Sequence, residues 1–130
     1  MLPATALLVV TTPQTTARIV ATRVARMATD GGVPIAGVIE NMSSAQCGHC
    51  QGHTAIFGSG GGAQLAQEAG APLLGHIPLD LALRDAADAG APVVVHSPGS
   101  SSARELARVA AALPTPRRSL AGRSLPLAVV

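Results

Sequence analysis

The sequence contains no lysine, no tryptophan and no tyrosine, and Phe57 is its only aromatic residue. Hydrophobic residues make up 48% of the chain. Because only one of them is aromatic, the core must be built from valine, isoleucine, leucine and alanine. The absence of lysine excludes a complete phosphate-binding P-loop, since the lysine of that motif reaches the nucleotide phosphates. No apolar run approaches the roughly 18 residues that a membrane helix needs. We therefore expect no membrane partner.

The start of the chain and its charge distribution exclude two further classes. Residues 1–4 lack the basic beginning of a signal peptide, which indicates a cytoplasmic protein. The formal net charge is +2, but three of the nine arginines lie in the last stretch, at Arg117, Arg118 and Arg123. Without those three, six arginines face seven acidic residues. The excess of positive charge belongs to the C-terminal end, so we expect no nucleic-acid partner.

The hydrophobic pattern predicts an α/β domain. Apolar, β-rich runs predict strands over 6–11 and 34–40, joined by a helix that begins near Thr12 and Pro13 and stops at Gly31. A strand, helix and strand with short joints form a parallel pair with a right-handed crossover. Further along, the sequence predicts a helix ending at Gly70, a strand over 72–78, a helix over 79–87 and an extended piece over 92–96. A last helix is predicted to start at Ser102, because Ser102 and Glu105 have the spacing of a capping box.

The expected fold is thus a partial doubly wound parallel sheet with flanking helices. Residues 1–114 are expected to form this domain, and residues 115–130 have no periodicity and are expected to be a disordered tail.

Two thiols three positions apart, in the segment CGHCQGH, are the main chemical feature of the sequence. Cys47 and Cys50 could bind one zinc ion together with His49 and His53, although chelation by one such short loop is sterically awkward. A thioredoxin-like pair would start a helix, and glycines follow Cys50 instead. An iron–sulfur cluster needs four cysteines, which two chains together would supply. The loop by itself does not decide between three interpretations of the cysteines: a metal site, an iron–sulfur cluster site, and thiols that are redox-active or incidental.

Other polar segments have simpler structural interpretations. GSGGGAQ, residues 58–64, precedes a helix but lacks the P-loop lysine, so a flexible lead into the helix is preferred over a phosphate site. His76 and His96 end or interrupt apolar segments and are expected to be structural. Arg84 and Asp88 have the spacing of a surface ion pair on a helix.

Several motifs in a fixed order point to a known family. They are VVTTPQ, GVIENMS, CGHC, IFGSGGGAQLAQEAGAPLLGHIPLD and LRDAADAGAPVVV, followed by a closing helix. Between about residues 7 and 113, this order resembles the C-terminal half of the Mrp/ApbC-type iron–sulfur cluster carrier ATPases, a branch of the ParA/MinD-like P-loop NTPases.

The resemblance implies roles for particular residues. Asn41 would lie near the adenine of ATP, and Pro78, Leu79 and Asp80 would line the other side of the base. Cys47 and Cys50 would hold a [4Fe-4S] cluster between the two subunits of a homodimer that meet at the CxxC loop. Apo iron–sulfur proteins would be the recipients of the cluster.

The chain also departs from the family pattern. It contains neither the lysine-bearing P-loop nor the Asp-x-Pro-Pro-Gly-Thr-Gly-Asp segment that precede VVTTPQ in the family. These segments hold the phosphates and Mg²⁺ in phosphoryl transfer. We therefore expect ATP binding to be weak or absent, no Mg²⁺ without the missing half, no catalytic residues and no ATP hydrolysis by these 130 residues.

The leading hypothesis is a truncated or split cluster carrier. One alternative is a non-enzymatic interaction fragment that pairs with a separate, P-loop-bearing N-terminal half. Another is a small zinc or redox module using Cys47, Cys50 and His53. In either of the first two cases the sheet would have an exposed edge and uncovered apolar faces, which predicts a chain that is marginally stable or aggregates without a partner.

Overall fold

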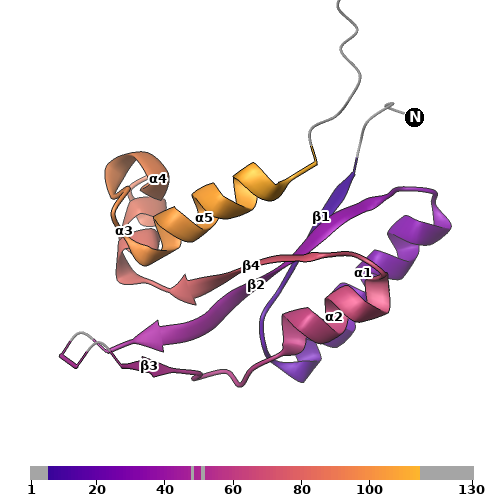
Figure 1. The fold of residues 1–130 in the computed structure, drawn as a ribbon, viewed down its shortest axis with the longest axis horizontal. Helices are drawn as coiled ribbons and strands as arrows, with labels where there is room; N and C mark the ends of the chain where they lie inside the picture. Colours follow the sequence, from indigo (N-terminus) through magenta and orange to yellow (C-terminus); the bar gives the residue numbers. More distant parts are fainter. Residues whose placement is uncertain (1–5, 48, 51, 115–130) are drawn as a thin grey trace, which may run out of the picture.

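The computed structural model describes residues 6–47, 49–50 and 52–114, which form an α/β fold. The predicted tail, 115–130, lies outside the described residues. The elements in chain order are β1 (Leu7–Thr11), α1 (Thr15–Asp30), β2 (Ile35–Gln46), β3 (His53–Thr54), α2 (Gly61–Ala69), β4 (Leu73–Leu79), α3 (Leu81–Asp88), α4 (Val93–His96) and α5 (Ser101–Ala112). The α/β class and the order of the main elements are confirmed (Figure 1).

The sheet is built around β2, which pairs in parallel with β1 on one side and with β4 on the other. The first pairing runs from Leu7 opposite Ile35 to Thr11 opposite Glu40. The two-residue β3, which the hydrophobic pattern did not predict, adds an antiparallel pairing at the far end of β2. The sheet is therefore mixed, with the expected parallel strands at its centre.

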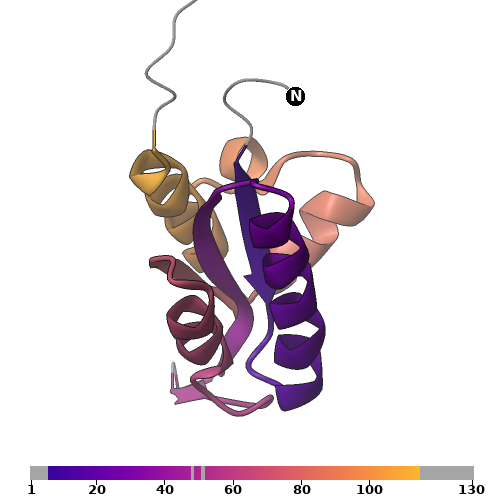
Figure 2. The same cartoon turned by 90° about the vertical axis from the view of Figure 1, so that its right-hand side faces the viewer.

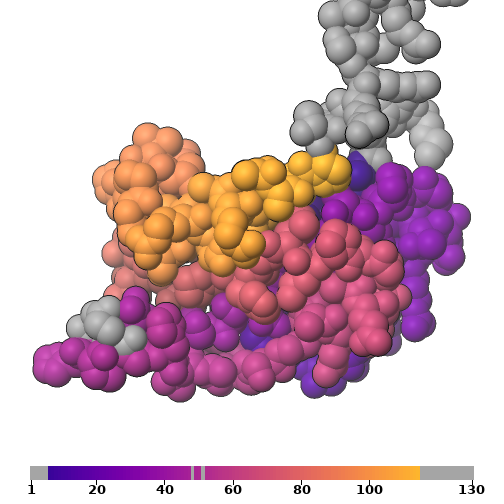
Figure 3. Space-filling view, in the orientation of Figure 1, coloured from indigo at the N-terminus to yellow at the C-terminus, as the bar shows by residue number. Residues whose placement is uncertain are grey.

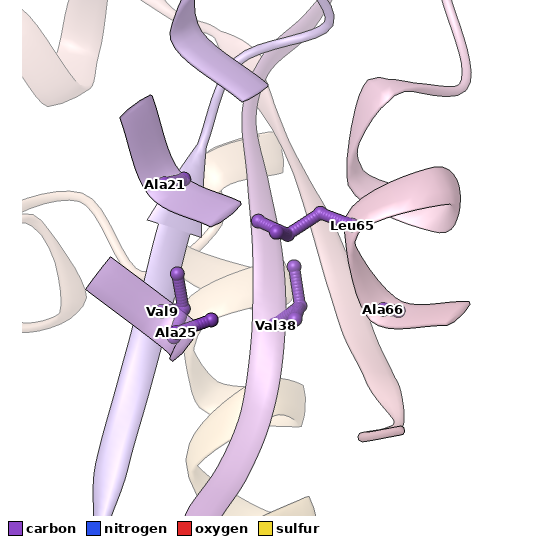
Figure 4. Close-up of a cluster of buried hydrophobic side chains, with 6 residues drawn as sticks. All are labelled: Val9, Ala21, Ala25, Val38, Leu65 and Ala66. Atoms are coloured by element: carbon purple, nitrogen blue, oxygen red, sulfur yellow. The ribbon is translucent and has the colours of Figure 1, made fainter. Parts of the chain in front are cut away.

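Helices cover both faces of the sheet (Figures 1 and 2). On one face, α1 and α2 enclose a cluster whose buried members are shown in Figure 4 and are Val9, Ala21, Ala25, Val38, Leu65 and Ala66. On the other face, Val109 of α5 packs with Ile39, Leu74 and Ile77. Neighbouring residues of β2, Val38 and Ile39, serve opposite faces, as the alternation of a strand requires.

Three predicted helix starts or types were wrong. Helix α1 begins at Thr15 after the N-cap Gln14 rather than near Thr12 and Pro13, and no side chain caps it; the Thr12 hydroxyl donates to Gln14 Oε1 (3.0 Å). Helix α5 begins at Ser101 after the N-cap Ser100, and the side chain of Ser102 is taken up by a contact with another element. The segment predicted to be extended is instead the short helix α4, in which Val93 is buried.

β2 continues six residues beyond the predicted end at Glu40. Pairing with β3 and β4 explains this extension, because Ala45 lies opposite both Thr54 and Leu79. The register with β4 shifts between Asn41 and Ala45, and in this irregular stretch Met42 has a positive φ of 55°. A positive φ is uncommon outside glycine and often marks a functional site. Local sequence patterns do not reveal this bulge.

No helix in the described part of the chain is both long enough and apolar enough to cross a membrane.

Candidate functional site

The two cysteines lie at the end of a β-hairpin that extends from the sheet. Gln46 of β2 pairs with His53 of β3, and the Cys47 N–H donates to the carbonyl of Gly52 (2.8 Å). This hairpin protrudes from the body of the molecule, beyond the ends of β2 and β4 (Figures 1 and 3). Both thiols are free and exposed. The structure therefore presents the cysteine pair at the molecular surface.

The backbone of the loop stabilises a thiolate at Cys47. The N–H groups of Cys50 and His49 donate to the Cys47 sulfur, and these bonds, with a further one from the Cys50 thiol, lower the pKa of Cys47 below its ordinary value. The thiolate is the form of cysteine that binds metals. The thiolate is also the nucleophile of redox reactions, so the lowered pKa fits either a metal site or a redox pair.

The described residues contain no group of three or more His, Cys, Asp or Glu side chains placed to hold a metal ion. His49 and His53 are both exposed, and His53 belongs to β3. Thus the arrangement shown here supplies two sulfur ligands from one chain.

The residues predicted to contact a nucleotide base lie near one another on β2 and β4, with Asn41 midway along β2 and Pro78 and Leu79 at the carboxyl end of β4. Asn41 is opposite Ile77, which places it next to Pro78, and Leu79 is exposed at the end of β4. Asn41 Oδ1 accepts the Met42 N–H (2.9 Å) and Asn41 is half-buried. Ligands of open α/β sheets bind outside the carboxyl ends of the strands. The structure thus brings Asn41, Pro78 and Leu79 to one edge.

Asp80, the fourth predicted base-contacting residue, joins two helices. Its Oδ1 accepts the Ala82 N–H (2.9 Å) and caps α3, while Oδ2 accepts from the Ser102 hydroxyl (2.7 Å), the Ser102 N–H (3.1 Å) and the Ser101 hydroxyl (3.2 Å). Burial raises the pKa of Asp80, but these hydrogen bonds outweigh it and leave the pKa below its ordinary value. The carboxylate thus connects the start of α3 to the start of α5.

Glu40 is a structural anchor that the sequence analysis missed. Its side chain is buried at the end of an apolar strand, where Oε2 accepts the Gly62 N–H (2.6 Å) and Oε1 lies 3.1 Å from His76 Nδ1. The contact places a carboxylate at the N-terminus of α2, where helix amides favour an anion. An acidic residue within an otherwise apolar strand is the signal that could have identified it.

This anchor also explains the glycine-rich segment before α2. A Cβ on Gly62 would lie 2.6 Å from Glu40 Cβ, and one on Gly61 would lie 2.6 Å from the Pro13 carbonyl oxygen. Gly60, the N-cap, has φ 82°. The glycines allow close approach of α2 to β2 and to the loop after β1, and Glu40 already occupies the anion position at the helix start.

The predicted ion pair between Arg84 and Asp88 is not the one observed. Arg84 donates through Nε (2.8 Å) and Nη2 (2.6 Å) to Oδ1 of its neighbour Asp85. Both partners are largely exposed, so the pair is a surface feature of α3.

Curated relatives match part of this chain. It is 45% identical over 83 residues to the iron-sulfur cluster carrier protein of Pyrococcus horikoshii, a match that covers 64% of this chain and 28% of the relative. The corresponding protein of Escherichia coli K12 is 43% identical over 87 residues, covering 67% and 24%. Human cytosolic Fe-S cluster assembly factor NUBP2 is 46% identical over 76 residues, covering 58% and 28%. The chain thus spans about a quarter of the length of these relatives.

Solved structures support the same fold. The cell division ATPase MinD of Pyrococcus furiosus superposes with a TM-score of 0.64 at 24% identity, over 81% of this chain and 40% of that chain. The family model of ParA, described as NUBPL iron-transfer P-loop NTPase, matches residues 1–114. This match includes the hairpin with both cysteines and the carboxyl edge of the sheet. The chain therefore belongs to the ParA family of iron-transfer P-loop NTPases, of which the Mrp/ApbC-type iron–sulfur cluster carriers are part.

Proposed function

We propose that this chain is an iron–sulfur cluster carrier that binds a [4Fe-4S] cluster through Cys47 and Cys50 at the interface of a homodimer. The observation that supports the proposal most directly is the exposed pair of thiols at the end of the hairpin, with amides directed at the Cys47 sulfur. The relatives from Pyrococcus and Escherichia coli are named iron-sulfur cluster carrier proteins, and we take the proposed cargo, an iron–sulfur cluster, from those names. A cytoplasmic location and transfer to apo iron–sulfur proteins belong to the same proposal.

The ligand count supports a shared cluster. A [4Fe-4S] cluster takes four cysteine ligands, and one chain contains two cysteines. The hairpin protrudes at one end of the molecule (Figure 3), and we propose that two copies bring their hairpins together there. Each protomer then donates two sulfurs to a cluster that lies between them.

The carboxyl edge of the sheet is proposed to keep the base-contacting part of a nucleotide site. In this proposal Asn41, Pro78 and Leu79 contact the base, and Asp80 supports this region through its bonds to Ala82 of α3 and Ser102 of α5. No lysine is available to hold phosphates. We therefore propose that ATP binds weakly, if it binds, and is not hydrolysed by these residues.

Anaerobic reconstitution with iron and sulfide tests the proposal. We expect about one [4Fe-4S] cluster per two chains, with broad visible absorbance and a shift from monomer to dimer when the cluster is loaded. Cys47→Ser and Cys50→Ser should each abolish both signals, because each removes two of the four sulfurs from the dimer. His53→Ala is the matched control and should leave cluster content unchanged.

The zinc alternative has a distinct result in the same experiment. One zinc ion per monomer, lost in His53→Ala and unaccompanied by dimerisation, would reject the shared cluster and favour a small zinc module. The shared cluster would also be rejected if the protein remains colourless and monomeric under conditions that load the Escherichia coli relative with a cluster.

A further inference from the structure

Helix α1 packs against α2 on one face of the sheet (Figure 2), and a hollow of about 290 Å³ lies where the two helices meet. It involves neither cysteine and none of the residues proposed to contact a base. Most of its lining is polar and comes from α1, and α2 contributes one carboxylate. We call it the arginine groove and define it by Arg18, Ile19, Thr22, Arg23, Arg26 and Glu68.

The carboxylate of the groove is already engaged within the fold. The Arg18 guanidinium forms an ion pair with Glu68 Oε1. The other oxygen, Oε2, accepts a hydrogen bond from the Thr22 hydroxyl (2.8 Å). Glu68 therefore uses both of its oxygens to hold residues of the first turns of α1, and it neutralises one of the three arginines of the groove.

Arg23 and Arg26 are the two arginines of the groove that Glu68 does not engage. Both are exposed, and neither forms an ion pair within the described residues. Asp30 lies one helical turn after Arg26 but forms no ion pair with it there. All seven acidic residues of the sequence fall within the described ranges, so the remaining residues have no acidic side chain to offer the groove. A carboxylate that binds Arg23 and Arg26 must therefore come from another molecule.

Apolar side chains accompany these charges. Ile19 lines the groove and is 43% exposed, and Met27 on the same helix is 69% exposed. Ile19, Arg23 and Met27 are four residues apart in turn and so share one face of α1. An acidic polypeptide matches both kinds of group, because carboxylates bind guanidinium groups and an apolar residue can contact Ile19. Single-stranded nucleic acid instead stacks its bases on aromatic side chains, and the residues that line the groove include none.

We propose that the arginine groove binds an acidic segment of a partner polypeptide, whose carboxylates pair with Arg23 and Arg26 and whose apolar side chain contacts Ile19. A guanidinium group can bind a carboxylate through two parallel hydrogen bonds, which adds direction to the attraction. Because Glu68 holds Arg18 and Thr22, the next turn of α1 presents its arginines to the partner. This interaction is separate from the proposed cluster.

The test uses the full chain with its cysteines reduced and a fluorescein-labelled peptide of alternating glutamate and leucine. We expect the fluorescence anisotropy of the peptide to rise on binding and the affinity to fall as salt is added. Arg23→Ala combined with Arg26→Ala should weaken binding about tenfold, because two ion pairs are lost. Ile19→Ser should weaken it about threefold, and should not affect a peptide with serine in place of leucine. Circular dichroism shows whether each variant is folded.

Arg84→Ala combined with Arg104→Ala is the matched control, since both arginines are exposed and lie on α3 and α5, away from the groove. It removes the same charge and should leave the affinity unchanged. Equal losses for the two pairs of substitutions would overturn the proposal, as would equal binding of a peptide with glutamine in place of glutamate, or no binding at all. Tighter binding of single-stranded RNA than of the peptide, lost when Arg23 and Arg26 are both replaced, would overturn it in favour of a nucleic-acid site.

Discussion

At the scale of single residues, the acidic and sulfur groups of this chain fall into two environments. Cys47 and Cys50 are exposed at the end of a hairpin, available to a metal cluster. Glu40 is buried and fully engaged within the fold, where it holds α2 and contacts His76. The buried carboxylate therefore serves the fold, whereas the exposed thiols are the groups that the proposed function would use.

We predict that Glu40→Ala lowers the free energy of unfolding by about 1–3 kcal/mol, because it removes the acceptor of the buried Gly62 N–H. Urea unfolding at pH 7 measures the change. Glu68→Ala is the control: Glu68 pairs with Arg18 and Thr22 near the surface, and its loss should cost less than about 1 kcal/mol. Equal effects of the two substitutions would contradict the anchoring role of Glu40.

At the scale of elements, short polar contacts determine where helices start. Asp80 ties the N-termini of α3 and α5 together, and Glu40 positions α2. The glycines at the start of α2 are needed because the helix approaches two other segments closely. Each of these contacts links parts of the chain that are far apart in sequence.

The Asp80 contacts predict a stability that depends on pH. Asp80→Ala should lower the free energy of unfolding by about 1–3 kcal/mol at pH 7. Because the pKa of Asp80 is lowered in the folded state, its stabilisation is complete above the unfolded value of about 3.9 and is lost as the pH falls through the folded value. The difference between Asp80→Ala and the parent chain should therefore shrink below pH 4.

Urea unfolding between pH 2 and pH 7 measures this difference. Asp85→Ala provides the control, since Asp85 forms an exposed pair with Arg84 and its loss should change stability little at any pH. A difference for Asp80→Ala that grows on acidification would contradict the observed hydrogen bonding.

The packing of α2 predicts a cost for the smallest possible substitution. Gly62→Ala should lower the free energy of unfolding by about 1–3 kcal/mol, because the new methyl group meets Glu40 Cβ at 2.6 Å. Gly99→Ala, where no atom lies within 4 Å of the added carbon, should change it by less than about 0.5 kcal/mol. Thermal unfolding of the two variants gives the comparison, and a neutral Gly62→Ala would show that α2 can shift.

At the scale of the whole molecule, the sheet is covered unevenly. Helices α1 and α2 cover one face, whereas α5 covers only the β4 side of the other. The described residues therefore include exposed apolar side chains along β1 and α1, among them Val10 and Val20.

We predict that the isolated chain is marginally stable and self-associates through this surface. Light scattering should show aggregation that increases with concentration, and combining Val10→Lys with Val20→Lys should reduce it. Val95→Lys should have no such effect. A wild-type monomer that stays soluble and melts cooperatively above about 65 °C would contradict the prediction.

The sequence by itself determined the α/β class, the parallel pairing of β1 with β2 and the identity of the cysteine pair. These follow from local information: apolar runs of strand length, glycines at helix ends, and thiols at a fixed spacing. Resemblance to a family added the expected roles of Asn41, Pro78 and Leu79. Those roles stay predictions, because the structure contains no nucleotide.

Only the tertiary structure decided how the polar groups are used. Asp80 binds Ser102, Glu40 binds Gly62, and β2 extends past Glu40 because β3 and β4 pair with its far end. An exposed sheet edge was expected from the sequence, but only the strand pairing shows that β1 forms one edge among the described residues. Contacts between residues distant in the chain depend on how the elements pack, and local patterns in the sequence do not contain that information.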